Sequence, residues 1–285
     1  MNPATILKLV LLLGVVLLVV AIGARARLEQ PLALLRRPGL ALRALLAMYG
    51  LFPAGVLALV AVAPLREGVG AVLLGFAVAP VLPPWARKGL AIGGQSEVVM
   101  GLQILSTVVG LLLIPPMLWL VGRVFGVSTV LAPLAVEQVL LVTVVAPLAV
   151  GMGLAKLRPA AAERLATGAE RVGGLLLLLG AVVLLLVQGP AILGVIGQGT
   201  LLATVAVVVV GLAVGHGLGG PQQGNRGALA SATVSRHPAI ALVLATAAGQ
   251  GSEATVIGTV LLYLLVVLLI SAPYERWCHP SRSPR

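Results

Sequence analysis

Charged and aromatic residues are scarce in this sequence. Of its 285 residues, 9% are charged and 3% are aromatic, whereas 60% are hydrophobic. A water-soluble domain of this size carries about a quarter charged residues, so the polar groups here are too few to cover a water-facing surface. The sequence therefore predicts an integral membrane protein whose surroundings are the lipid bilayer.

Other absences exclude several classes of function. The single cysteine, Cys278, excludes a disulfide framework and multi-cysteine metal or iron–sulfur sites. No H-E-x-x-H, G-x-S-x-G or phosphate-binding G-x-x-x-x-G-K-[ST] motif occurs, so we expect neither an enzyme nor a bound metal or cofactor. The net charge of +11 lies in short basic blocks without interleaved aromatic residues, which argues against nucleic-acid binding.

Apolar runs of about twenty residues, the length that crosses a bilayer as a helix, recur along the chain. Two of the runs are interrupted, and each of these is counted as one crossing. The sequence then predicts nine membrane-spanning helices at residues 4–23, 40–63, 69–107 (interrupted), 108–122, 130–155, 170–191, 197–218, 222–249 (interrupted) and 253–272.

Three basic blocks determine the predicted orientation. They lie at residues 24–43, 156–171 and 273–285, and four crossings separate each block from the next. All three then face one side of the membrane, as the positive-inside rule expects of cytoplasmic segments. We expect a multi-pass protein of the cell membrane with its N-terminus outside and a cytoplasmic tail. The arginines that follow the first run favour a membrane helix there over a signal peptide.

The order of the spans repeats along the chain. Helix, helix, interrupted helix, helix describes residues 4–122 and again residues 168–272, with the unpaired helix at 130–155 between them. Matching elements lie five crossings apart, and an odd offset inverts the second set. The predicted fold is an all-α polytopic membrane domain over residues 1–285. Its two inverted-topology repeats each carry a discontinuous helix, and the two discontinuous helices cross, as in many secondary transporters.

Both interruptions contain proline. In APVLPPWARKG (residues 79–89), the Pro-Pro pair removes two backbone donors. In Ser-Arg-His-Pro (residues 235–238), the residue before the proline disfavours helix, so we expect a helix to end near residue 235 and another to begin at Pro238. Such breaks survive in a membrane only inside protein or beside a wet cavity. The restarting helix and the charge of Arg236 predict an anion-attracting, hydrated site.

We expect the two breaks together to bind a small organic anion. Arg236 either supplies the counter-charge for the anion or caps backbone carbonyl groups at the break. His237 either carries a coupling proton or caps carbonyl groups, and Trp85 either lines the site or simply packs. The predicted substrate-binding residues are Pro83, Pro84, Trp85, Ala86, Ser235, Arg236, His237 and Pro238.

Three polar residues, Gln95, Glu97 and Gln103, follow the first break. They are candidates for ion coupling or for a second layer around the site, with Glu97 paired to a nearby basic residue. The alternative is that Gly93-Gly94 marks a turn near the surface, where these groups are simply solvated.

Residues 77–117 resemble the fourth and fifth helices of the bile acid:sodium symporter superfamily. Residues 35–59 resemble its preceding helix, and residues 232–247 resemble its ninth-helix crossover. The shared features are a proline-bearing crossover, a Gly-polar turn, and a Ser-Thr pair followed by a proline, here Pro80, Gly94-Gln95, Ser106-Thr107 and Pro115. The resemblance implies a transporter fold of ten helices in typical members, the first of which would be missing here.

The sequence departs from that family where the resemblance implies bound sodium. The expected oxygen-bearing ligands fall on Met48, Trp85, Ala86, Val99, Gln103, Ala232, Arg236 and His237. We therefore expect a secondary transporter of a small organic anion that works by alternating access, with proton coupling or no coupling in place of sodium. The alternative is a non-transporting membrane sensor or assembly partner on a transporter-like fold.

Overall fold

The structure is a computed structural model that describes residues 3–25, 34, 36–82, 84–125, 138 and 141–278. These residues form helices joined by turns, and no β-strand occurs among them. Within this described part, five helices are long and apolar enough to cross a membrane, namely Thr5–Arg25, Pro38–Val62, Pro159–Val195, Thr200–Leu218 and Glu253–Cys278. The chain is therefore all-helical and consistent with a helical membrane protein, as its composition predicts.

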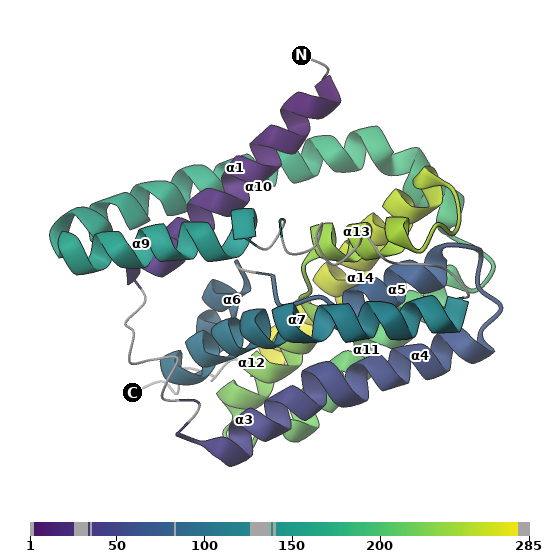
Figure 1. The fold of residues 1–285 in the computed structure, drawn as a ribbon, viewed down its shortest axis with the longest axis horizontal. Helices are drawn as coiled ribbons and strands as arrows, with labels where there is room; N and C mark the ends of the chain where they lie inside the picture. The colour runs from purple at the N-terminus through teal and green to yellow at the C-terminus, as the bar shows by residue number, and fades with distance from the viewer. Residues whose placement is uncertain are drawn as a thin grey trace. The chain divides into compact units, whose positions relative to one another are not determined.

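The helices follow one another in a simple order (Figure 1). They are α1 (Pro3–Arg25), α3 (Pro38–Leu45), the π-helical turn η1 (Leu46–Leu51), α4 (Phe52–Val62), α5 (Val69–Val78), α6 (Trp85–Ala91), α7 (Ser96–Phe125), the π-helical turn η2 (Leu141–Val145), α9 (Ala146–Leu157), α10 (Pro159–Val195), α11 (Thr200–Leu218), α12 (Gln223–Val234), α13 (Pro238–Ala247) and α14 (Glu253–Cys278).

The chain divides into two compact units, each assembled from distant parts of the sequence. Unit 1 contains residues 1–28 and 137–190, and unit 2 contains residues 29–136 and 191–285. The units do not coincide with the predicted repeats, because α1 and most of α10 belong to unit 1 while the remaining helices of both repeats belong to unit 2.

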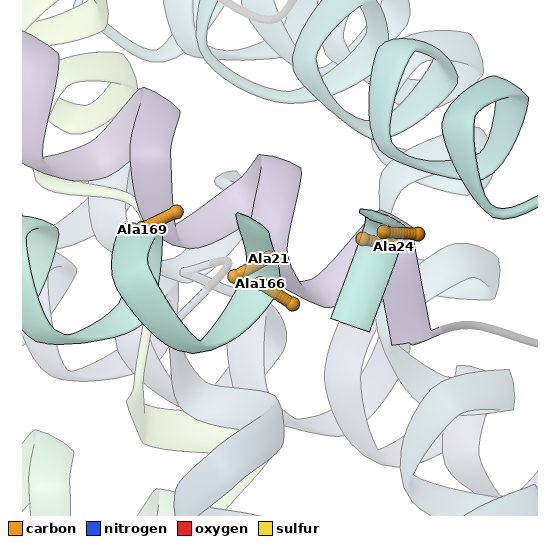
Figure 2. Packing of buried hydrophobic residues seen from close by; sticks show 5 residues of the cluster. Ala21, Ala24, Ala166 and Ala169 are labelled. Carbon is orange, nitrogen blue, oxygen red and sulfur yellow. The ribbon is translucent and has the colours of Figure 1, made fainter. Parts of the chain in front are cut away.

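Small residues bring the helices of unit 1 close together. A Cβ added at Gly151 would lie 2.7 Å from the backbone nitrogen of Ala24, so α1 and α9 touch backbone to backbone. Arg25, at the end of α1, donates hydrogen bonds to Glu163 and Glu170 of α10. Between α1 and α10 lies a cluster of five buried alanines, Ala21, Ala24, Ala162, Ala166 and Ala169. All of them except Ala162 are labelled in Figure 2.

Several predicted boundaries are wrong. No helix boundary falls between residues 107 and 108, because α7 is continuous from Ser96 to Phe125 and the reversal comes earlier, at the glycine turn before it. The predicted loop 156–171 is almost entirely helical: its alanine-rich sequence favours helix and Pro159 begins α10. Helix α14 also continues to Cys278, inside the predicted tail 273–285.

Unit 2 contains both interrupted helices. The first consists of α5 and α6, and the second consists of α12 and α13. Helices α7 and α14 contact them, as do η1, α4 and α11. The candidate site is built from these elements alone.

Candidate functional site

The two helix breaks lie where proline interrupts the backbone. Helix α12 ends at Val234 and α13 begins at Pro238, which confirms the predicted second break. The first break begins at residue 79, as predicted, but is shorter than the predicted 79–89, because α5 ends at Val78 and α6 already begins at Trp85. Trp85 and Ala86 therefore belong to the first turn of α6 and not to the break. Pro83 lies outside the described residues.

Backbone hydrogen bonds join the two breaks directly. The N–H of Leu82 donates to the carbonyl of Ser235, and the N–H of His237 donates to the carbonyl of Pro80, both at 2.9 Å. Val81 and Arg236 are thereby paired as an isolated antiparallel bridge. Each break supplies the donor or acceptor that the other has lost, which is how irregular backbone can exist in an apolar interior.

The antiparallel pairing extends along both interrupted helices. On one side of the crossing α5 packs on α13, where a Cβ at Gly75 would lie 2.8 Å from the carbonyl oxygen of Ala241. On the other side α6 packs on α12, where the indole N–H of Trp85 donates to the hydroxyl of Ser231 at 3.2 Å. The two interrupted helices therefore run antiparallel to each other, with α5 beside α13 and α6 beside α12.

Helix α7 pairs with the backbone of Val81 in the first break. The hydroxyl of Ser106 accepts from the N–H of Val81 at 2.8 Å, and the side-chain amide of Gln103 donates to the carbonyl of Val81 at 3.3 Å. The hydroxyl of Tyr49, in η1, donates to the carbonyl of Ser106 at 2.6 Å. The buried Oε1 of Gln103 accepts no hydrogen bond from the described residues.

Helix α14 supplies a hydrogen-bond donor at the second break. The hydroxyl of Tyr263 donates to the carbonyl of Val234 at 2.9 Å. The Tyr263 ring is stacked on Phe76 of α5 with the ring centroids 3.8 Å apart. Tyr263 and Phe76 are both fully buried, so this ring pair holds α14 against the crossing.

Arg236 is 1% exposed, and backbone carbonyl groups surround its guanidinium. Its Nε donates to Thr233 at 2.7 Å, Nη1 to Ala79 at 2.9 Å and Nη2 to Met48 at 2.7 Å. The rings of Tyr49 and Phe52 lie 5.4 and 5.3 Å from the guanidinium carbon. No carboxylate among the described residues forms an ion pair with it. These contacts are those of the capping arginine, the second of the two roles expected for this residue.

The crossing has one buried side and one partly exposed side. Val81, Arg236 and His237 are buried, at 1%, 1% and 3% exposure. Four residues at the same crossing are only partly buried: Leu82, Pro84, Ser235 and Pro238. These four residues are accessible from outside the described chain, whereas the neighbouring Arg236 is enclosed.

The other predicted residues lie away from this side. Trp85 is 2% exposed and packs between α6 and α12. Gln95 lies in the turn between α6 and α7, where its Oε1 accepts from Arg37 at 2.8 Å and from Asn225 at 3.2 Å. Glu97 is exposed in the first turn of α7, which fits the solvated alternative.

Sequence reasoning missed a polar chain that links α6, α12 and α14. Lys88 forms an ion pair with Glu275 at 2.7 Å, and the hydroxyl of Ser231 donates to the same carboxylate at 3.1 Å. Sequence reasoning also missed Tyr49 and Tyr263. The sequence signal that could have identified these residues is their rarity, because the chain has only three tyrosines and eight acidic residues. Each of them that lies in an apolar run is therefore a candidate for a specific hydrogen bond.

No protein-family model and no curated protein sequence matches the chain. The resemblance to the bile acid:sodium symporter superfamily therefore stays a prediction. Among the described residues, no three His, Cys, Asp or Glu side chains gather as the ligands of a metal ion would.

Proposed function

We propose that this protein is a secondary transporter of a small organic anion and not an enzyme. The observation that carries the proposal is the pair of helix breaks, hydrogen-bonded to each other through Leu82, Ser235, Pro80 and His237 inside an apolar helical unit. Backbone irregularity of this kind is rare in membrane helices and is tolerated where it is buried in protein or lines a pathway. Crossed discontinuous helices are a recurring way to place a substrate near the middle of the bilayer.

The proposed architecture has nine crossings and two inverted repeats, with the N-terminus outside the cell membrane and the C-terminus in the cytoplasm. The matched antiparallel pairing of α5 with α13 and of α6 with α12 supports it, because two elements related by a two-fold axis in the membrane plane pack in this way.

The proposed substrate surface is the partly exposed side of the crossing, formed by Leu82, Pro84, Ser235 and Pro238. Its apolar groups suit a hydrocarbon body, and the Ser235 hydroxyl suits a carboxylate. The charge of Arg236 remains unneutralised, because a guanidinium stays protonated and its hydrogen-bond partners are neutral carbonyl groups. That charge attracts an anion electrostatically through the low-dielectric interior without touching it.

Uptake into proteoliposomes tests the proposal. Purified protein would be reconstituted and assayed with a panel of radiolabelled mono- and dicarboxylates, against protein-free vesicles. Ser235→Trp fills the partly exposed side of the crossing and is expected to reduce uptake to the protein-free level. Thr246→Trp is the matched control, because it adds the same bulk at an exposed position of α13 and is expected to leave uptake unchanged.

Equal uptake by the two variants would remove the crossing from the transport path. Absence of uptake for the whole panel, together with thermal stabilisation of the wild-type protein by one of the carboxylates, would instead support the sensor or assembly partner. The same carboxylates should then fail to stabilise Ser235→Trp.

A further inference from the structure

Three carbonyl groups that bond Arg236 have lost their own helical partners. In a π-helical turn, the carbonyl of Met48 would accept from residue 53, but residue 53 is proline, and the N–H of Phe52 already donates to Ala47. The carbonyl of Ala79 is followed four and five residues later by prolines without an N–H. The loss has a different cause at the third carbonyl, that of Thr233.

At Thr233 the second break redirects the donors. The N–H of Arg236 turns back to Val234, and the N–H of His237 donates across the crossing to Pro80. The carbonyl of Thr233 is left to the side chain of Arg236, whose Nε reaches it at 2.7 Å. Three segments of the chain thus direct orphaned oxygens at a single cation.

The surroundings of that cation are those of an ion site without a carboxylate. Neutral carbonyl oxygens at unwound helix segments coordinate monovalent cations in membrane proteins, and the faces of Tyr49 and Phe52 add cation–π attraction. The guanidinium is planar and its donors point in fixed directions, which matches three oxygens from three directions. No dissociable ion is needed to hold the crossing together.

We infer that Arg236 is a covalently attached substitute for a bound monovalent cation. It assembles the crossing permanently, so the folded site does not depend on sodium from solution. Removal of the side chain converts the place of the guanidinium into a binding site for a small planar cation. Under the proposed function, on which this last step rests, substrate uptake is then independent of a sodium gradient.

Chemical rescue of Arg236→Ala tests the inference. The melting temperature of the purified variant is expected to fall well below that of the wild type, and N-ethylguanidinium at millimolar concentration should restore at least half of the loss. N-ethylurea has nearly the same shape without the charge and should restore none. Arg226→Ala is the matched control: Arg226 also lies on α12, but it is half-buried and donates to one carbonyl, that of Gly220 at 2.6 Å. Neither compound should raise its melting temperature.

Two results would overturn the inference. One is equal rescue of Arg236→Ala by the charged and the neutral compound, or rescue by neither. The other needs no variant, and so applies even if Arg236→Ala does not fold: the wild-type protein should melt at the same temperature in sodium chloride and choline chloride, and stabilisation by sodium contradicts the claim. Neither readout measures flux, so a failure of transport leaves both results valid. Sodium-driven uptake would overturn the inference while supporting the proposed function.

Discussion

The close contact of α5 with α13 gives the sharpest test of the crossing. A Cβ at Gly75 would lie 2.8 Å from the carbonyl oxygen of Ala241 and 3.1 Å from its Cα, both backbone atoms that cannot rotate away. Ordinary Cβ contacts lie at 3.4–4 Å. Gly75→Ala therefore forces the two interrupted helices apart. Gly174→Ala is its matched control, because Gly174 is also inside a helix and a Cβ there meets nothing within 4 Å.

The expected magnitude follows from two opposing effects. Replacing glycine by alanine inside a helix stabilises by about 0.5–1 kcal/mol, and this gain is common to both variants. Overpacking at a backbone contact costs about 1–3 kcal/mol and applies to Gly75→Ala alone. The difference in the free energy of unfolding between the two variants isolates the overpacking cost, and about 2–4 °C of melting temperature corresponds to each kcal/mol for a chain of this size.

Thermal unfolding of the detergent-solubilised proteins, followed by tryptophan fluorescence, measures this difference. Gly174→Ala is expected to melt at or above the wild-type temperature, and Gly75→Ala below it. Equal shifts for the two variants would mean that α5 and α13 do not touch at Gly75. The paired breaks, and with them the proposed site, would then be wrong.

Three further variants test single contacts by the same assay. Ser106→Ala leaves the buried N–H of Val81 without its acceptor and should lower the free energy of unfolding by about 1–3 kcal/mol. Tyr263→Phe keeps the ring and should lower it by about 1 kcal/mol or less, because the carbonyl of Val234 still accepts from a backbone N–H. A larger loss for Tyr263→Phe than for Ser106→Ala would contradict this ranking. Arg25→Gln removes the partly exposed ion pairs between α1 and α10. The loss in the free energy of unfolding should stay below about 1 kcal/mol and shrink with added salt. A loss of stability that persists in high salt would refute that account.

Local sequence chemistry was sufficient to predict the second break. A histidine before a proline disfavours helix, and proline is well tolerated in the first turn of the helix that follows, which places the end of α12 and the start of α13 within a few residues. The all-helical, membrane-type class was equally accessible, because composition alone excludes a water-covered surface. Both conclusions depend on properties of neighbouring residues or of the whole chain.

The role of Arg236 depends on contacts that are remote in sequence. Two of the carbonyl groups it bonds lie 157 and 188 residues away along the chain, so no local pattern distinguishes an arginine that awaits a substrate from one that caps backbone oxygens. The ends of the helices were predicted poorly for a different reason. Hydropathy detects the stretch that prefers lipid, whereas alanine-rich, charged sequence extends α10 well beyond that stretch.

The buried guanidinium connects the architecture of the crossing to the sign of the proposed substrate. Orphaned carbonyl groups at two proline breaks require donors, and arginine supplies several from one rigid group, which explains a full charge at 1% exposure. Because its described partners are neutral, removal of that charge from water costs several kcal/mol that no carboxylate of the described chain offsets. An anion near Ser235 would offset part of this cost, while a cation would add to it. Under the proposed function, the residue that completes the backbone hydrogen bonding of the crossing also makes the site selective for anions.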